Sequence, residues 1–223
     1  MGLRRIAGAI KKHMLDSARN RYLRSSTGVI HVGANIGQER DIYARYGLPV
    51  IWIEPIPEQF AELQRNIASF PQQRAIRALI TDRDGDRHTL HISNNYGASS
   101  SILDFKLHKE IWPDVHFVRD IQLTSQTLTT ALRSSEVDSA AYDVLALDTQ
   151  GSELMILRGA GPILDQFTYI KAEAADFESY VGGATVFQIA SFLAGHGFRL
   201  IREDIFARHA SGGRYFDLLF RKT

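Results

Sequence analysis

Two short apolar segments, each followed by a polar motif, constrain the fold of this chain most strongly. Residues 29–32 (Val-Ile-His-Val) run into a glycine-containing turn at residues 33–37 (Gly-Ala-Asn-Ile-Gly), and residues 50–53 (Val-Ile-Trp-Ile) end at Glu54. Short apolar runs bounded by turn residues are typical of buried strands in a parallel sheet. A glycine turn after one strand and a carboxylate after the next are typical of open α/β sheets that hold a nucleoside-containing cofactor. The sequence therefore indicates an enzyme.

Strand-like and helix-like segments alternate along the rest of the chain. Because no internal repeat or linker interrupts them, we expect a single α/β domain over residues 27–223. Turn residues at 82–86 include an Asp-Gly pair that suits a hairpin. Further strands are predicted at residues 75–80, 88–92, 118–123, 144–147, 167–170, 198–201 and 215–220, and helices at residues 36–46, 57–67, 128–132, 153–157 and 186–193.

The first 26 residues differ from the rest of the chain in charge. They carry a net charge of +6, whereas the whole chain of 223 residues carries +1. Apolar side chains recur among them at intervals of three and four, which predicts a basic amphipathic helix over residues 1–26. The favoured interpretation is a helix packed on the sheet with its basic face in solvent. The alternative is peripheral contact with an anionic membrane or an acidic partner.

Composition excludes several classes of protein. The chain has no cysteine, so it forms neither disulfides nor thiolate metal sites. No apolar run approaches the ~20 residues that cross a bilayer, and the N-terminus lacks the apolar core of a secretory signal. We therefore expect a cytoplasmic protein, peripheral to the inner face of a membrane if residues 1–26 bind lipid.

The glycine turn itself narrows the cofactor. A phosphate-binding loop ends in Gly-Lys-Ser/Thr, but Gly37 is followed by Gln38 and Glu39. A dinucleotide site has a third glycine, which is absent here, and Glu39 would place a negative charge near the pyrophosphate. A nucleoside cofactor without phosphate fits better, and S-adenosylmethionine is the common one.

Four motifs occur in an order and spacing that resemble a known family. They are residues 33–37, residues 54–57 (Glu-Pro-Ile-Pro), residues 98–101 (Ala-Ser-Ser-Ser) and residues 147–153 (Leu-Asp-Thr-Gln-Gly-Ser-Glu). Together they resemble the FkbM-type methyltransferases that depend on S-adenosylmethionine. The resemblance implies an α/β, Rossmann-like methyltransferase sheet of seven strands, mostly parallel with an antiparallel last strand and helices on both faces. It also implies O-methylation of hydroxyl groups on sugars, glycans or glycosylated natural products.

The same resemblance implies roles for individual residues. The glycine turn would lie under the methionine part of the cofactor, Glu54 would accept hydrogen bonds from the ribose, and Leu79 and Asp82 would contact the adenine. The spacing of Glu54 from the first glycine supports its role independently. The implied cofactor-binding residues are Gly33, Ala34, Asn35, Gly37, Gln38, Glu54, Pro55, Leu79, Asp82, Ser100 and Asp148.

Three positions depart from the family pattern. His31 stands where the family commonly has an acid that orients the methionine amino group, and we interpret it as a core residue, with a cofactor contact as the alternative. Ala146 and Gln150 replace a Lys and a Glu often found around Asp148. These replacements call into question any mechanism that needs that cation or that carboxylate.

Methyl transfer to a hydroxyl needs alignment and removal of one proton. Asp148 and Glu173 end neighbouring predicted strands, so Asp148 is the first candidate for the base, followed by Glu173 and His91. The same carboxylates, completed by Asp176, form the less favoured alternative of a divalent metal site.

Two other functions remain open at this point. One is a nucleic-acid methyltransferase, which is disfavoured because the motif after Asp148 lacks a Pro-Pro-aromatic turn and the chain beyond residue 26 has no basic surface pattern. The other is an inactive module that binds S-adenosylmethionine without transferring its methyl group. The expected partner is a hydroxylated small molecule, a glycan or a lipid-linked sugar, with no nucleic acid.

Overall fold

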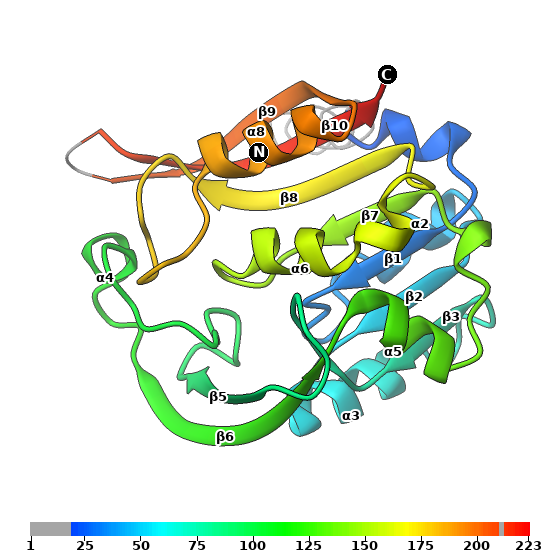
Figure 1. Cartoon of the computed structure of the whole chain (residues 1–223). Coiled ribbons are helices and arrows are strands. Elements are labelled where there is room, and N and C mark those ends of the chain that lie inside the picture. Colours follow the sequence, from blue (N-terminus) through cyan, green and yellow to red (C-terminus); the bar gives the residue numbers. More distant parts are fainter. Residues whose placement is uncertain (1–18, 210–211) are drawn as a thin grey trace, which may run out of the picture.

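A seven-stranded sheet forms the centre of the protein in a computed structural model that describes residues 19–209 and 212–223 (Figure 1). The strand order is β3-β2-β1-β7-β8-β10-β9, and only β10 runs antiparallel to its neighbours. This topology confirms the predicted fold class. The strands are β1 (Val29–Val32), β2 (Val50–Ile53), β3 (Gln73–Ile76), β7 (Val144–Leu147), β8 (Tyr169–Ala175), β9 (Phe198–Arg208) and β10 (Arg214–Lys222).

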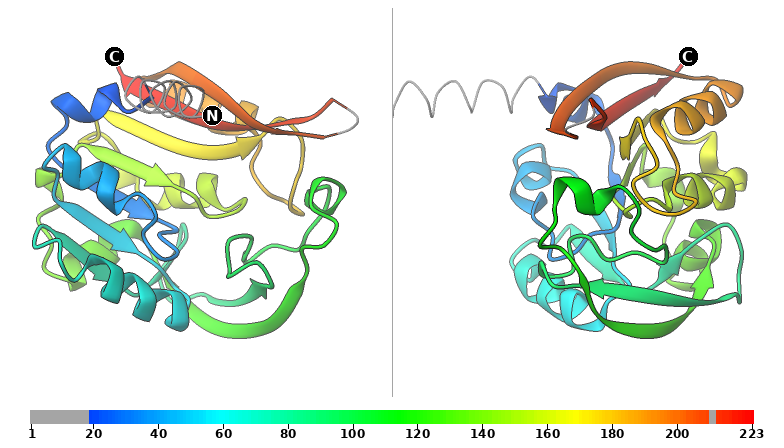
Figure 2. Two further views of the ribbon diagram at one scale, coloured as in Figure 1. Left: turned by 180° about the vertical axis from the view of Figure 1, so that it is seen from behind. Right: turned by 90° about the vertical axis from the view of Figure 1, so that its left-hand side faces the viewer.

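Helices cover both faces of this sheet because successive strand residues point to opposite sides. Ile30 and Val32 join a core under α5 (Leu128–Ser134), α6 (Glu153–Gly159), α7 (Gly161–Leu164) and α8 (Val186–Gly195). Val29 joins a second core under η1 (Arg21–Ser25), α2 (Arg40–Arg45) and α3 (Pro57–Ile67). Figure 2 shows α2 and α3 on the face opposite to α6 and α8. A short helix, η2 (Ser139–Ala141), precedes β7.

A separate three-stranded sheet flanks the main one and corrects two predictions. It contains β4 (Leu79–Ile80), β6 (Phe117–Gln126) and β5 (Arg87–Ser93) in that order, with α4 (His108–Ile111) between β5 and β6 (Figure 1). The single strand predicted at residues 75–80 is therefore wrong, because the chain leaves the main sheet after β3. The hairpin expected at residues 82–86 is also wrong, since β6 lies between β4 and β5.

The first predicted helix is shorter than expected. The helix α2 starts at Arg40 instead of residue 36. Asn35 and Gly37 have positive φ angles of 45° and 74°, so residues 35–39 form turns that place backbone beside the end of β1. The local conformation needed at the glycine turn thus delays the helix.

The predicted N-terminal helix is only partly represented, because residues 1–18 lie outside the described residues. In the described part, Tyr22 and Leu23 of η1 are buried in the core that covers Val29. Over residues 19–209 and 212–223, no helix is both long and apolar enough to span a bilayer.

Candidate functional site

The carboxyl ends of β1 and β7 approach each other at Gly33. This residue has a φ of +82°, and a Cβ atom there would lie 1.8 Å from the backbone oxygen of Asp148. The backbone N–H groups of Gly33 and Ala34 both donate to the carbonyl of Ile53, at 3.0 and 3.1 Å. Only glycine allows this close approach to the backbone of Asp148, which brings the turn after β1 beside Asp148 and the end of β2.

Glu54 follows β2 as a buried carboxylate. Its Oε2 accepts the backbone N–H of Asn35 at 2.7 Å, and its Oε1 accepts that of Ile56 at 2.9 Å. Burial raises the pKa of Glu54 to about 7, although these two hydrogen bonds oppose the shift. The carboxylate is therefore held in one orientation at the cavity wall, with lone pairs left for further donors.

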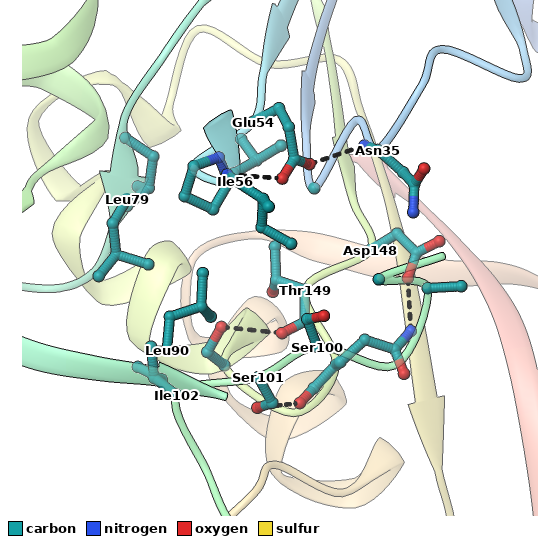
Figure 3. A pocket seen from close by; sticks show the side chains of 18 of the residues that line it. Asn35, Glu54, Ile56, Leu79, Leu90, Ser100, Ser101, Ile102, Asp148 and Thr149 are labelled. Atoms are coloured by element: carbon teal, nitrogen blue, oxygen red, sulfur yellow. Dashed lines mark hydrogen bonds between the residues drawn. The ribbon is translucent and has the colours of Figure 1, made fainter. Parts of the chain in front are cut away.

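A cavity of about 190 Å³ lies between the two sheets, at the carboxyl ends of β1, β2 and β7. Figure 3 shows Leu79, Leu90 and Ile102 gathered on one side of it, and Asn35 and Asp148 on the other. The cavity thus joins an apolar recess to a polar end, an arrangement suited to a ligand with an aromatic base and a charged tail.

Asp148 comes directly after β7, and its side chain is exposed in the cavity. The Nε2 of Gln150 donates to Oδ1 of Asp148 at 2.8 Å and to Oε1 of Glu173 at 3.3 Å. The hydroxyl of Tyr180 donates to Oε1 of Gln150 at 2.8 Å, which turns the amide nitrogen toward the two carboxyl groups. Loss of hydration inside the cavity raises the pKa of Asp148, while the hydrogen bond from Gln150 opposes the shift.

The loop that carries Asp148 is folded around a second buried carboxylate, Glu153. Its oxygens accept the backbone N–H groups of Thr149 and Gly151, at 2.9 and 3.0 Å. Burial raises the pKa of Glu153 to about 7. Ser101 adds a hydrogen bond from its hydroxyl to the backbone oxygen of Gln150 at 2.8 Å. These contacts fix the loop between β7 and α6 and thereby the position of Asp148.

His31 lies between the core and the cavity. Its ring stacks on Trp52 with centroids 4.9 Å apart, and its Nδ1 lies 3.1 Å from the hydroxyl of Tyr43. Burial lowers the pKa of His31 to about 4, so the imidazole is neutral at physiological pH. His31 is thus a packed core side chain that also forms part of the cavity wall. Its packing agrees with a core role, and its place in the wall leaves contact with a bound cofactor open to it.

Glu173 lies outside the main cavity, behind Gln150. It lines two smaller cavities, one shared with Tyr180 and Tyr215 and the other with Lys171 and Asp217. Burial and the neighbouring charge of Asp148 raise the pKa of Glu173 well above its ordinary value. Glu173 therefore holds its proton to higher pH than an exposed glutamic acid does.

The structure brings most of the predicted cofactor-binding residues together. Each of the following lines the main cavity: Gly33, Asn35, Gln38, Glu54, Pro55, Leu79, Ser100 and Asp148.

Three predicted cofactor residues lie beside the cavity without lining it. Ala34 is buried beneath the turn, and Gly37 packs so closely on α3 that a Cβ atom would lie 2.7 Å from Leu63. The backbone of Asp82 lies against Gly159 of α6. These residues shape the turn and the end of β4, and no cavity contact supports a direct role for them.

The structure does not assemble the remaining predicted groups at the cavity. His91 lies on β5 with its Nδ1 2.7 Å from Asp120 and its ring stacked on Phe117. Asp176 accepts hydrogen bonds from the backbone N–H and Nε of Arg214, and it does not line the cavities described here that Asp148 or Glu173 line. Within residues 19–209 and 212–223, no group of three or more His, Asp or Glu side chains is arranged to hold a metal ion.

Sequence reasoning missed several residues that build the site. In the sequence, Gln150 stands out only as a departure from the family pattern, Tyr180 belongs to none of the four motifs, and Glu153 is marked only as a motif member and the start of a helix. Two charged residues inside apolar strands, Lys171 and Asp217, were also missed, although a charge within a strand that reads as buried is itself a signal.

The order and direction of the seven strands are those of a Rossmann-like methyltransferase sheet. Residues 31–200 match the methyltransferase FkbM domain, and the chain belongs to that family, as the sequence motifs predicted. No curated protein sequence matches the chain.

Solved structures share its fold at low sequence identity. Magnesium protoporphyrin IX methyltransferase from Synechocystis PCC 6803, solved with bound SAM, is 11% identical, with a TM-score of 0.51 over 100% of this chain and 85% of that one. TrmK from M. capricolum, solved with S-adenosyl-homocysteine, is 10% identical, with a TM-score of 0.50 over 92% of this chain and 68% of that one. At these identities the likeness shows the fold.

Proposed function

We propose that this protein transfers a methyl group from S-adenosylmethionine to a hydroxyl group of a sugar, a glycan or a glycosylated natural product. The observation that carries the proposal is one cavity that combines the buried carboxylate of Glu54, an apolar recess and the exposed carboxylate of Asp148 (Figure 3). Membership in a methyltransferase family supports the reaction class. The motif resemblance supports oxygen as the acceptor atom.

The residues of the cavity fit S-adenosylmethionine part by part. Glu54 offers carboxylate lone pairs to the two hydroxyl groups of a ribose. Leu79, Leu90 and Ile102 offer apolar surface to a purine base. The polar end, beside the turn after β1 and Asp148, suits the charged methionine part.

The chemistry that the chain itself must perform is limited. When bound, S-adenosylmethionine supplies a methyl group on a sulfonium, which the acceptor oxygen attacks in line. Asp148 accepts the proton of the acceptor hydroxyl. Its raised pKa favours this role, because a carboxylate of ordinary pKa is a poor acceptor for the proton of an alcohol. Gln150 and Tyr180 hold Asp148 in place without competing for that proton.

An aromatic side chain near the cavity supports a carbohydrate acceptor. Tyr96 is 89% exposed, and its backbone oxygen is held by the side-chain amides of Asn35 and Gln59, each at 3.2 Å. Its neighbour Gly97 lines the cavity. An exposed ring on a fixed backbone presents an apolar face and a polar hydroxyl, which together suit the mixed surface of a sugar ring.

Calorimetry and methyl transfer test the proposal in sequence. We expect S-adenosylmethionine to bind the purified protein, and methyl-labelled cofactor to transfer its label to an acceptor from a panel of monosaccharides, glycans and lipid-linked sugars. Asp148→Asn should lower the transfer rate by about 100-fold or more, with a smaller effect on cofactor affinity.

Each contrary result points to a specific alternative. Absence of cofactor binding overturns the proposal at its first step. Binding without transfer to any hydroxylated acceptor would identify an inactive binding module, and label transferred to RNA or DNA would identify a nucleic-acid methyltransferase.

A further inference from the structure

Lys171 lies in the same row of the main sheet as His31 and Ala146. The parallel register pairs His31 of β1 with Ala146 of β7, and Ala146 with Lys171 of β8. Residues paired in this way point to the same face of a sheet. The Lys171 side chain therefore leaves the sheet on the face that carries His31, one strand beyond β7.

A small cavity of about 20 Å³ connects Lys171 to the proposed active site. Its lining includes Lys171, Asp217 and Glu173 together with His31, Glu39 and Asp148. The last three also line the main cavity. Lys171 and Asp148 therefore line one small cavity behind the main one, and the positive charge of Lys171 is one of several influences that act to lower the pKa of Asp148.

The ionisable groups of this small cavity are mostly acidic. Among its described lining residues, four carry carboxyl groups and Lys171 is the sole cation, because the His31 ring is neutral at physiological pH. Burial alone would lower the pKa of Lys171, but Asp217, Tyr22 and Glu39 raise it above its ordinary value, so the amine stays charged. The groups that face this charge from every packed element are Tyr22, His31, Glu39, Asp148, Glu173 and Asp217.

We propose that Lys171 is a positioning residue whose ammonium group, set one strand away from Asp148, is the counter-charge that keeps the Asp148 carboxylate ionised. This inference rests on the proposed function, in which ionised Asp148 accepts the acceptor proton. Ala146, the neighbour of Lys171 on β7, has no side-chain charge of its own and lines the same small cavity.

The competing explanation is a structural ion pair. The Nζ of Lys171 lies 3.1 Å from Oδ1 of Asp217, and both side chains are about one-third exposed. Ion pairs of this kind add little to stability. If Lys171 and Asp217 form only a structural ion pair, neutralising either residue breaks the pair and should have the same effect on the titration of Asp148. If Lys171 is the counter-charge to Asp148, neutralising the two residues should shift that titration in opposite directions. Neutralising Lys171 removes an attractive charge from Asp148, and neutralising Asp217 removes a repulsive one.

Carbon-13 NMR titration of the side-chain carboxyl groups tests this distinction in the cofactor-free protein. The Asp148 signal is assigned by its loss in Asp148→Asn. We expect the Asp148 midpoint to move to higher pH in Lys171→Met, to stay near the wild-type value in Lys171→Arg, and to stay or move to lower pH in Asp217→Asn. An unchanged midpoint in Lys171→Met overturns the proposal, as does an upward shift of equal size in Lys171→Met and Asp217→Asn.

Moving the charge across the strands provides a second test. Adding Ala146→Lys to Lys171→Met places an ammonium group on β7 in the same row, and we expect it to return the Asp148 midpoint toward the wild-type value. If Lys171→Met does not fold by circular dichroism, the comparison of Lys171→Arg with Lys171→Gln replaces it, with the same expected direction. The inference is overturned if the Asp148 midpoint does not return toward the wild-type value with Ala146→Lys and does not differ between Lys171→Arg and Lys171→Gln.

Transfer activity separates this inference from the proposed function. If wild-type protein transfers methyl groups, the acid limb of its pH–rate profile should move to higher pH in Lys171→Met and remain in Lys171→Arg. A normal profile in Lys171→Met would overturn the role of Lys171 and leave the proposed function intact. If wild-type protein binds no cofactor, the proposed function fails, and the NMR midpoints still decide the electrostatic coupling.

Discussion

Glu54 is buried and accepts two backbone hydrogen bonds. Both features affect how strongly its carboxylate can bind a hydroxylated ligand. Because its orientation is fixed by Asn35 and Ile56, replacement by an isosteric amide changes its charge and one of its acceptors while keeping its size. We predict that Glu54→Gln lowers the affinity for S-adenosylmethionine by about tenfold or more, since hydrogen bonds to a charged acceptor are the stronger kind. Calorimetry at pH 8, where the native carboxyl group is mostly ionised, measures the change.

The matched control for that variant is Glu62→Gln on α3, an exposed residue that does not line the cavity. It should leave the affinity unchanged. Equal affinity of wild-type protein and Glu54→Gln would remove Glu54 from the cofactor site.

The raised pKa of Glu54 also predicts how stability depends on pH. The folded protein holds this proton up to about pH 7, whereas the unfolded chain releases it near 4.5. Its contribution to the free energy of unfolding is therefore full below about pH 4.5 and is lost as the pH rises to about 7. We predict that cofactor-free wild-type protein loses on the order of 2 kcal/mol relative to Glu54→Gln across this interval.

Urea denaturation of both proteins at several pH values measures that difference. Comparing the two proteins cancels the contribution of every other titrating group that the substitution leaves unaffected. A constant difference between pH 4.5 and 8 would contradict the burial of an uncharged Glu54.

At the scale of elements, the close approach of the segments that follow β1 and β7 depends on Gly33. We predict that Gly33→Ala lowers the free energy of unfolding by roughly 3 kcal/mol or more, because the new Cβ atom meets the backbone of Asp148 and the φ angle is unfavourable. Gly47→Ala is the control, since Gly47 has a φ of +68° but no atom within 4 Å of the added Cβ. It should cost only about 1 kcal/mol. Chemical denaturation measures the free energy of unfolding of both variants. Similar losses in the two would show that the contact between Gly33 and the backbone of Asp148 is not tight.

The loop after β5 presents Tyr96 near the cavity. If its ring stacks on a sugar, Tyr96→Ala should raise the KM for the acceptor by about tenfold, and Tyr96→Phe should raise it much less. The affinity for S-adenosylmethionine should change little in either variant. Steady-state kinetics with the acceptor identified by the labelling experiment measures the effect, and an unchanged KM in Tyr96→Ala would exclude the ring from acceptor binding.

Local patterns were enough to predict most of the main sheet, because its strands are short apolar runs that directly precede turn residues. Glu54 and Asp148 were found in the same way, each as the first polar residue after such a run. The strand predicted at residues 75–80 failed because Leu79 pairs with Ser125, far along the chain. Lys171 was missed for a similar reason, since its place beside Ala146 depends on the register of two separate strands.

At the scale of the whole molecule, Tyr22 and Leu23 bury the first described segment in the core. Deletion of residues 1–18 is the reference for the next experiment, because it leaves both of these side chains in place. Deletion of residues 1–24 should cost roughly 3 kcal/mol or more, because it removes two buried side chains. Chemical denaturation of both truncated proteins measures the difference, and equal stability would show that η1 contributes nothing to the core.

Deletion of residues 1–18 also tests what the charge of the N-terminal segment does. Residues 1–18 carry a net charge of +3. Reduced sedimentation of the shortened protein with anionic vesicles would support peripheral membrane contact, and unchanged sedimentation would support packing of the segment on the sheet.

The main cavity is bounded by β1 and the end of β2 on one side and by β4 and β5 on the other, so its two walls come from sheets that share no strand. A molecule that contacts both walls adds to the hydrogen bonds that already join them, such as those from Ser101 to Gln150 and from Asn35 to Tyr96. Part of its binding free energy then goes into holding the two walls together. Loss of the bound molecule should therefore weaken the contact between the two walls of the cavity.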